Sequence, residues 1–351
     1  MNTKVYLMLA DGMSVHTYKW AKEIKKYVDL YVFSVNGSSK ALRILLGDNH
    51  VIEDNICVDA GGANVSALRI VRKLIPLINR LNPVIINAHY ITSYGTLAIL
   101  AATLTAYKGK IILSTWGSDV LVTPYKNKWY YYLTKFLLKR ADMVTSDSLY
   151  MTENIQQIYK FAKVMTFPMG VEDIPNVSED EKMDDLIFSN RGLEKNYNID
   201  KVLKIFYTMV GKNRNLKLVV ANDGSQRNRL EKLMETLNLQ NNVKFVGYLN
   251  AEQQSMFYRY SRYFISLPTS DSTSVSLLEA MSYGCIPIVS DIYANREWIV
   301  NGENGVIVKN EKNIDLHHLR KTDIFLKNRE IIRKKAIWRD NVAEFIRVIN
   351  N

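Results

Sequence analysis

Short apolar runs rich in β-branched residues alternate with longer stretches of helical periodicity along this chain of 351 residues. This alternation is typical of parallel β-sheets covered by helices on both faces. In the first half, strands are predicted at 4–9, 30–35, 84–88, 110–115, 142–146 and 164–167, and helices at 15–27, 64–81, 94–107, 127–140 and 151–159. In the second half, strands are predicted at 186–189, 216–221, 243–246, 263–267 and 286–290. Two such sheets in one chain predict an α/β protein with two Rossmann-like domains.

The predicted domain boundary lies at the Pro168-Met169-Gly170-Val171 segment. A polar, acidic stretch at 178–185 follows, and we interpret it as an exposed linker rather than a metal site. We therefore expect an N-terminal domain of residues 1–170 and a C-terminal domain of residues 171–330. The last residues, 331–351, are expected to form a charged amphipathic helix that packs back on the N-terminal domain.

The composition, 47% hydrophobic and 23% charged, is that of a globular protein. Two cysteines, Cys57 and Cys285, are too few for a disulfide framework and favour an intracellular setting. The N-terminus lacks a signal-peptide cleavage pattern, and no uncharged run approaches the roughly 18–20 residues that span a bilayer. We expect a cytoplasmic protein, either soluble or peripheral at the inner face of the plasma membrane.

The net charge of +11 is distributed unevenly. Residues 1–171 carry 20 Lys and Arg against 11 Asp and Glu, whereas the remaining residues carry 26 against 24. Such an imbalance favours an anionic partner, namely a membrane surface, a nucleic acid or an acidic acceptor, with general solubility as the alternative. The helix at 127–140 mixes aromatic and basic residues. It suits an anionic membrane interface, unless Trp129, Leu133, Phe136 and Leu137 pack on the sheet instead.

Polar residues follow the first two strands of the second half, where open parallel sheets bind their ligands. Arg191 and Lys195 lie four residues apart after the strand at 186–189. They either clamp a diphosphate or are two surface charges. The turn from Asn222 to Ser225 includes Gly224 and follows the next strand. It either lets the backbone approach a nucleotide or is a plain strand–helix turn.

The strongest candidate segment follows the strand at 263–267. A polar loop leads into a helix that begins near Ser274, and the free amides of a helix N-terminus suit an anion. Glu279 lies outside the apolar stripe of this helix, so we expect it to face a cleft. Asp271 precedes it by eight residues. Carboxylates accept hydrogen bonds from the paired hydroxyls of a ribose or a sugar, although Asp271 has the alternative role of a helix cap.

Together these segments resemble the GT-B retaining glycosyltransferases of family 4, the glycosyl transferases group 1. The resemblance covers most of residues 185–310 and is most specific in the stretch Leu277-Leu278-Glu279-Ala280-Met281-Ser282-Tyr283-Gly284-Cys285-Ile286-Pro287. It includes Arg191 and Lys195, the turn with Asn222 and Gly224, and Tyr248 after the third strand. The resemblance implies two domains that face each other across a cleft. It also implies that Glu279 holds the ribose hydroxyls of a nucleotide.

The loop before the helix departs from the family pattern at two points. The family usually has two glutamates eight residues apart, and here the first of them is Asp271. The usual Gly-Phe-Gly-like loop is replaced by Ser272, Thr273 and Ser274, which the resemblance places, together with Val275, beside the donor sugar and diphosphate. Both changes bear on the identity of the sugar.

The N-terminal half resembles the family less sharply. Gly12 lies in the first strand-end loop, which in the family normally faces the acceptor. The segment from Ser114 to Asp119 is similar to one that often carries a histidine near the donor sugar, but Trp116 takes that place here. Asp119 is the next polar candidate. His89 ends another strand, and it either faces the cleft or is a structural histidine.

The resemblance implies a retaining transfer in which the leaving phosphate takes the acceptor proton. Arg191, Lys195 and the helix amides would neutralise the leaving diphosphate, with Asp271 and Asp119 as further catalytic candidates. The sequence has no Asp-x-Asp, so neither a metal nor another cofactor is expected. We expect a hexosyltransferase that moves a sugar from a UDP- or GDP-sugar to a glycan or lipid-linked acceptor in cell-surface polysaccharide synthesis. The alternatives are a sugar-nucleotide epimerase of the same fold and a non-catalytic nucleotide-binding module. No nucleic-acid partner is expected, because no RNA-binding strand motif occurs.

Overall fold

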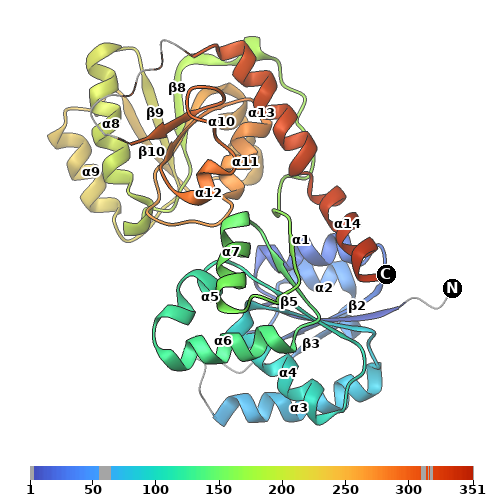
Figure 1. The fold of residues 1–351 in the computed structure, drawn as a ribbon. Coiled ribbons are helices and arrows are strands. Elements are labelled where there is room, and N and C mark those ends of the chain that lie inside the picture. Colours follow the sequence, from blue (N-terminus) through green and yellow to red (C-terminus); the bar gives the residue numbers. More distant parts are fainter. Residues whose placement is uncertain (1–3, 55–64, 310–313, 315, 317–318, 351) are drawn as a thin grey trace. The chain divides into compact units, whose positions relative to one another are not determined.

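The computed structural model describes residues 4–54, 65–309, 314, 316 and 319–350. The chain divides into two compact units, each with its own sheet and core (Figure 1). The N-terminal unit comprises Met1–Phe167 together with Arg339–Asn351, and the C-terminal unit comprises Pro168–Trp338. Within the described residues, no helix has the length and apolar character needed to cross a membrane.

The N-terminal unit has a parallel sheet of seven strands in the order β3-β2-β1-β4-β5-β6-β7. The strands are β1 (Val5–Leu9), β2 (Asp29–Ser34), β3 (Val51–Glu53), β4 (Ile85–His89), β5 (Lys110–Ser114), β6 (Met143–Ser146) and β7 (Val164–Thr166). The helices are α1 (Val15–Ile24), α2 (Lys40–Leu46), α3 (Val65–Leu81), α4 (Thr96–Leu104), α5 (Ser118–Leu121), α6 (Lys128–Arg140) and α7 (Leu149–Ile158).

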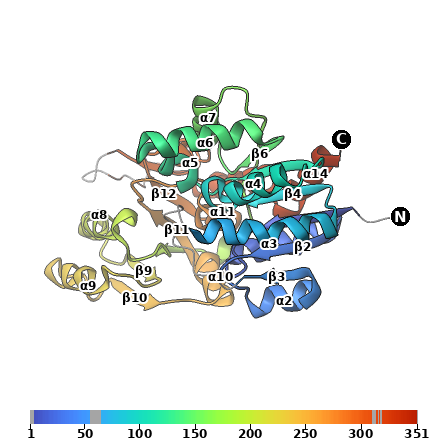
Figure 2. The same cartoon turned by 90° about the horizontal axis from the view of Figure 1, so that it is seen from below.

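Strand order determines which face of this sheet each helix covers. The chain runs from β1 outward to β3 and then returns to β4 on the other side of β1. Because crossovers between parallel strands are right-handed, α1 and α2 cover one face and α3, α4 and α6 cover the other. Figure 2 shows α4 between α3 and α6 on that second face. The reversal between β1 and β4 places the loops that follow these two strands side by side.

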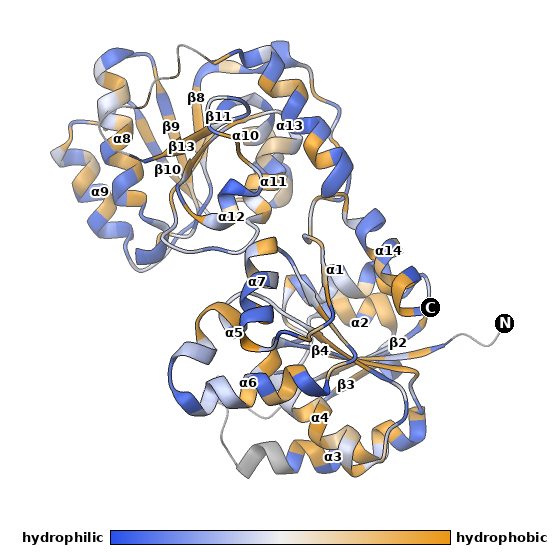
Figure 3. Ribbon diagram, viewed as in Figure 1, coloured by the Kyte–Doolittle hydropathy of each residue, from blue (hydrophilic) through white to orange (hydrophobic). Residues whose placement is uncertain are grey.

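The C-terminal unit has a parallel sheet of six strands in the order β10-β9-β8-β11-β12-β13. The strands are β8 (Met183–Ser189), β9 (Lys217–Ala221), β10 (Val243–Gly247), β11 (Ser261–Ser266), β12 (Ile286–Ser290) and β13 (Val306–Val308). The helices are α8 (Ile199–Lys212), α9 (Arg227–Thr236), α10 (Ala251–Tyr260), α11 (Val275–Ser282), α12 (Tyr293–Arg296) and α13 (Lys321–Lys335). Apolar residues dominate the strands of both sheets, as Figure 3 shows, because helices bury them from both sides. The predicted α/β class with two Rossmann-like domains is confirmed.

The helical pattern at the C-terminus forms two helices, α13 and α14 (Trp338–Asn350), rather than one. Between them, the Ala336 carbonyl accepts the Val171 amide at 2.8 Å, and the Trp338 amide donates to the Val171 carbonyl at 2.8 Å. These groups therefore bond the segment after Gly170 instead of continuing a helix. Helix α14 belongs to the N-terminal unit, where the Phe345 ring lies 5.6 Å from that of Trp20 in α1.

The expectation of an exposed linker at 178–185 is wrong for its last residues, because β8 begins at Met183. Three of its five acidic residues, Glu179, Glu181 and Asp184, pair with arginines. Glu179 and Asp184 bind Arg262 at 3.0 and 2.7 Å, and Glu181 lies 2.8 Å from Arg259. Strand β8 thus begins inside a network of ion pairs.

Candidate active site

The candidate site lies where the chain reverses between β8 and β11, the switch point of the C-terminal sheet. At such a point, neighbouring loops leave the carboxyl ends of adjacent strands in opposite directions, and ligands of open α/β sheets bind there. Here the two loops are hydrogen-bonded to each other. Asn198 donates its side-chain amide to the Leu267 carbonyl at 2.8 Å, and the Thr269 amide donates to the Asn196 carbonyl at 2.8 Å.

Arg191, from the loop after β8, reaches the loop after β11. Its guanidinium donates to Asp271 Oδ2 at 2.7 Å and to Ser274 Oγ at 2.5 Å, and it lies 4.4 Å from the centre of the Tyr197 ring. The Arg191 side chain is only 10% exposed and that of Asp271 21%, so this ion pair is shielded from solvent. Burial raises the pKa of Asp271, and the charge of Arg191 opposes that shift. Asp271 thus orients a cation at the start of α11.

Ser274 is the N-cap of α11, because its hydroxyl accepts the Leu277 amide. Ser272, Thr273 and Ser274 are all buried, and Val275 opens the first helical turn. The first N–H groups of a helix have no intrahelical carbonyl partner and carry its positive dipole end. The predicted serine–threonine loop therefore brings the amide end of α11 next to the guanidinium of Arg191.

Glu279 lies one turn further along α11 and is half-buried. Its Oε2 atom is 3.1 Å from the hydroxyl of Tyr258 on α10. That hydroxyl also accepts the Asn190 side-chain amide at 2.7 Å and lies 3.3 Å from the Ser276 carbonyl. Burial, reinforced by the charge of Glu279, raises the pKa of Tyr258 well above its ordinary value, so the phenol keeps its proton. Tyr258 and Asn190 hold Glu279 in place, and the sequence analysis missed both.

The turn after β9 joins three strand-end loops. Asn222 has a left-handed backbone with φ of 78°. Its amide donates to the Gly247 carbonyl at 2.6 Å, and its side chain donates to the Asn190 carbonyl at 2.9 Å. A Cβ atom on Gly224 would lie 2.6 Å from the Leu193 carbonyl oxygen, so only glycine lets this turn approach the loop after β8. The turn therefore braces the loop that carries Arg191.

Two predicted residues are exposed at the rim of this unit. Lys195 begins the short 3₁₀ helix Lys195–Tyr197, one turn after Arg191, and its side chain is exposed. Tyr248 follows β10 and is 76% exposed. Their predicted contacts with a donor stay predictions.

The corresponding switch point of the N-terminal unit lies between β1 and β4. Gly12 follows β1, and its amide donates to Ser34 Oγ at 2.8 Å. His89 ends β4, is buried, and places Nε2 3.1 Å from Asn87 Oδ1. Burial, together with the nearby His16, lowers the pKa of His89 to about 3, so the imidazole is neutral near pH 7. Nδ1 of His89 is buried and has no hydrogen-bond partner within the described chain.

Asp119 ties two strand-end loops of this unit together. Its carboxylate accepts the Trp116 amide at 3.0 Å and the Ile91 amide at 3.1 Å. Burial raises the pKa of Asp119, against the effect of these amides. The Trp116 ring lies 5.0 Å from His16 and 6.1 Å from Tyr90, whose φ of 68° is rare for a residue with a side chain. The predicted catalytic role of Asp119 stays a prediction beside this positioning role.

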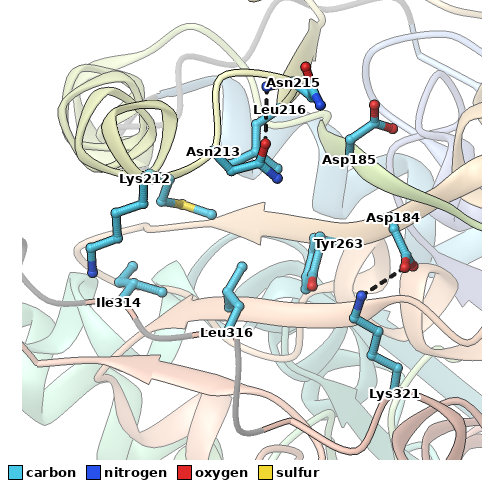
Figure 4. A pocket seen from close by; sticks show the side chains of 11 residues that line it. Asp184, Asp185, Lys212, Asn213, Asn215, Leu216, Tyr263, Ile314, Leu316 and Lys321 are labelled. Atoms are coloured by element: carbon cyan, nitrogen blue, oxygen red, sulfur yellow. Dashed lines mark hydrogen bonds and ion pairs between the residues drawn. The ribbon is translucent and has the colours of Figure 1, made fainter.

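A cavity of about 510 Å³ lies at the opposite, amino-terminal edge of the C-terminal sheet. Tyr263, Leu216 and Lys212 line it, and Lys321 pairs with Asp184 at 2.8 Å on its wall (Figure 4). Ligands of open α/β sheets bind at the carboxyl edge, so this cavity is separate from the candidate site. Among the residues that the structure describes, no group of three or more His, Cys, Asp or Glu side chains is arranged to hold a metal ion.

Two parallel-sheet units of this kind, each with polar groups at its switch point, define the GT-B class of glycosyltransferase fold. The family model for glycosyl transferases group 1 matches residues 170–341, and the model for glycosyl transferase 4-like proteins matches residues 5–148. The chain therefore belongs to the group 1, family 4-like glycosyltransferases, and it is an enzyme of the transferase class.

Individual relatives are distant. The α-monoglucosyldiacylglycerol synthase of Streptococcus pneumoniae is 31% identical over 93 residues, which are 26% of this chain and only 21% of that protein. An uncharacterised glycosyltransferase of Methanocaldococcus jannaschii is 26% identical over 284 residues, 72% of this chain and 71% of that protein. The crystal structure of HepE from Anabaena in complex with UDP-glucose is 14% identical and covers 97% of this chain and 99% of that one, with a TM-score of 0.74. The structural match shows a shared fold.

Proposed function

We propose that this glycosyltransferase is a retaining hexosyltransferase that moves a sugar from a UDP- or GDP-sugar to a glycan or lipid-linked acceptor in cell-surface polysaccharide synthesis. The observation that carries the proposal is the arrangement of Arg191 at the start of α11 and Glu279 one turn further along the same helix. The start of that helix offers a cation and amides, and its second turn offers a carboxylate fixed by Tyr258. A nucleoside diphosphate has the complementary groups.

Glu279 would accept hydrogen bonds from the two ribose hydroxyls. A carboxylate is the natural acceptor for a pair of adjacent hydroxyls, and its two oxygens must then point outward in a fixed orientation. The buried Tyr258 hydroxyl provides that orientation because it contacts Oε2. Asn222 and Gly224 follow β9, which lies beside β8, and Tyr248 follows β10, the next strand outward; there they would border the nucleotide.

Arg191 would bind the diphosphate together with Lys195 and the first amides of α11. A guanidinium has more N–H donors than its contacts with Asp271 and Ser274 use, so phosphate oxygens can add to this arrangement. During transfer, the bond from the sugar C1 to the diphosphate oxygen breaks, and the acceptor oxygen bonds to C1 on the same face. The acceptor proton goes to the departing phosphate oxygen. The cations stabilise the negative charge that develops there.

This charge neutralisation by protein groups is the reason to propose that no metal or other cofactor is needed. Treatment with a chelator should leave the transfer rate unchanged. A rate that falls on chelation and returns with a divalent cation would contradict this part of the proposal.

Two comparisons support the donor and acceptor classes. HepE, which shares the fold, binds UDP-glucose, and the streptococcal relative is named as a synthase of a glucosylated diacylglycerol. The second of these supports a lipid-linked acceptor over a free glycan; a cytoplasmic location at the inner face of the plasma membrane is part of the proposal. In the N-terminal unit, Gly12, His89 and Asp119 surround the switch point that we assign to acceptor recognition.

Thermal denaturation with nucleotide sugars tests the proposal, because a ligand that binds only the native state raises its melting temperature. UDP, GDP and their glucose and mannose derivatives are compared for the wild type and for two variants. Glu279→Ala should abolish most of the shift, whereas Lys195→Ala should reduce it less and mainly slow transfer. Equal shifts in all three proteins would refute the site. An epimerised sugar formed from donor alone, without acceptor, would identify the epimerase alternative.

A further inference from the structure

The exposed side of α6 is made entirely of aromatic and basic side chains. Its exposed residues, here called the α6 face, are Lys128, Trp129, Tyr132, Lys135, Phe136, Lys139 and Arg140. The three aromatic residues follow helical spacing and therefore point the same way. Thr134, Leu137 and Leu138 face the core instead. The helix is thus anchored by one side and presents the other to its surroundings.

The aromatic side chains of this face are exposed to an unusual degree. Trp129 is 56% exposed, Tyr132 65% and Phe136 46%. The expectation that Trp129 and Phe136 pack on the sheet is therefore wrong, whereas Leu137 is buried and Leu133 partly buried as that alternative required. A folded protein leaves three large rings in solvent on one helix at a cost, which suggests that a partner covers them.

The chain from α3 to the end of α6 carries a strong excess of positive charge. Between residues 65 and 141 the chain has 11 Lys and Arg residues and a single acidic residue, Asp119. Asp119 is buried in contact with backbone amides and does not offset this charge at the surface; among the cations, Lys73 on α3 pairs with Asp54, which lies outside the span. The neighbouring α4 adds the exposed Leu100 and Leu104, and α3 adds exposed arginines such as Arg72. Cations and apolar side chains therefore share one surface.

We propose that the α6 face binds the surface of an anionic lipid bilayer. Tryptophan and tyrosine rings suit the level of the lipid headgroups, because their polar end can contact water while the rest of the ring contacts apolar chains. The flanking lysines and arginines bind lipid phosphates. A nucleic acid would use the cations but gives Phe136 and Leu104 no apolar contact. A second copy of the chain would place like charges against each other. The surface of an anionic bilayer can bind both the cationic and the aromatic side chains of this face.

This inference rests on the proposed function only in that binding would bring a lipid-linked acceptor to the enzyme. The surface lies on α6, and the nucleotide site lies in the C-terminal unit, so each can be tested without the other. Failure of vesicle binding with an intact response to nucleotides would overturn only the membrane inference. Failure of the nucleotide response with intact vesicle binding would overturn only the donor site.

Sedimentation with vesicles of phosphatidylcholine, with and without phosphatidylglycerol, tests the inference on the full chain. The wild type should sediment with the phosphatidylglycerol vesicles and stay in solution with pure phosphatidylcholine. The double variant Lys135→Gln/Lys139→Gln should bind roughly tenfold more weakly or worse. The matched double variant Lys40→Gln/Lys244→Gln removes the same charge from α2 and β10 and should bind like the wild type.

A second pair of variants separates insertion of the rings from simple charge attraction. Trp129→Ser/Phe136→Ser should lose the binding that survives in high salt, whereas Tyr207→Ser, an exposed ring on α8, should keep it. Each variant is compared with the wild type for its melting temperature and for its shift with UDP, which should not change. Binding to both vesicle types alike, equal binding by the charge variants, or tighter binding to duplex DNA than to anionic vesicles would overturn the inference.

Discussion

The hydroxyl of Tyr258 lies 3.1 Å from Glu279 Oε2, which links a buried phenol on α10 to a half-buried carboxylate on α11. The phenol is fixed in turn by Asn190, at the end of β8. A carboxylate held in this way loses little conformational entropy when a ligand binds it. Removal of the Tyr258 hydroxyl oxygen should therefore weaken binding of a donor to Glu279.

Tyr258→Phe should raise KM for the nucleotide sugar about tenfold and change kcat much less. Loss of a hydrogen bond to a charged group costs roughly 1.5–3 kcal/mol, and part of that cost falls on donor binding. Steady-state kinetics with varied donor measure the effect. Tyr260→Phe, on the same helix but partly exposed, is the control and should behave like the wild type. An unchanged KM in Tyr258→Phe would contradict the role of Tyr258 in positioning Glu279 for the donor.

Arg191→Lys should lower kcat about a hundredfold, although it preserves the charge. The guanidinium contacts Asp271, Ser274 and the Tyr197 ring together, and a lysine ammonium cannot reproduce this planar arrangement. Loss of a preorganised donor at a developing anion costs this order of rate. Single-turnover measurements at saturating donor separate the chemical step from binding. The matched control is Arg229→Lys on α9, which is largely exposed and should retain full activity. A rate within twofold of the wild type for Arg191→Lys would contradict the assignment.

His89 should make the protein less stable in acid. Its pKa is lowered to about 3 in the folded state, below the ordinary value of 6.5, so the unfolded chain binds the proton first. The free energy of unfolding therefore falls as pH decreases from about 6.5 towards 3, by a few kcal/mol in total.

Urea denaturation at pH 7, 5.5 and 4 measures this slope. His89→Gln should flatten it, because glutamine does not titrate, whereas His50→Gln at the half-exposed His50 is the comparison variant. The carboxylates that titrate in the same range are common to all three proteins, so only the difference between slopes is interpreted. Parallel slopes for the wild type and His89→Gln would show that burial of this imidazole does not affect acid stability.

Gly170→Ala should destabilise the C-terminal unit by about 3 kcal/mol or more. Gly170 has a φ of 64°, and a Cβ atom there would lie 2.1 Å from the Ala336 carbonyl oxygen. The methyl group would break the bridge between Val171 and Ile337. Gly211→Ala in α8 meets no neighbouring atom and should be neutral or stabilising by up to about 1 kcal/mol. Equal melting temperatures for the two variants would contradict this account of the segment.

The sequence predicted the elements whose apolar runs are long and missed those set by distant contacts. Strands β3 and β13, of three residues each at the sheet edges, were missed, although the equally short edge strand β7 was predicted. The break between α13 and α14 depends on Val171, far away in the chain, so local propensity does not show it. The acidic stretch at 178–185 was interpreted as a linker because its partners, Arg259 and Arg262, lie about 80 residues later in the chain.

The candidate site, like the fold, could be predicted from the sequence only in part. The loop and helix around Ser274 and Glu279 were predictable because a strand end, a polar loop and an apolar stripe follow one another directly. The pairing of Arg191 with Asp271 and the role of Tyr258 join segments that only the folded sheet brings together. Exposure of Trp129 and Phe136 was equally hidden, because an aromatic residue on a helix gives the same sequence pattern whether it packs inward or outward.

Without a ligand, the guanidinium of Arg191 is already paired with the carboxylate of Asp271. A free phosphate or sulfate ion must compete with that carboxylate and has no ribose to offer to Glu279, one turn further along α11. On the proposed function, a nucleotide sugar would also bind Glu279 and so compensate for the weakened contact between Arg191 and Asp271. The acid beside the arginine would then favour nucleotides over small inorganic anions at this site.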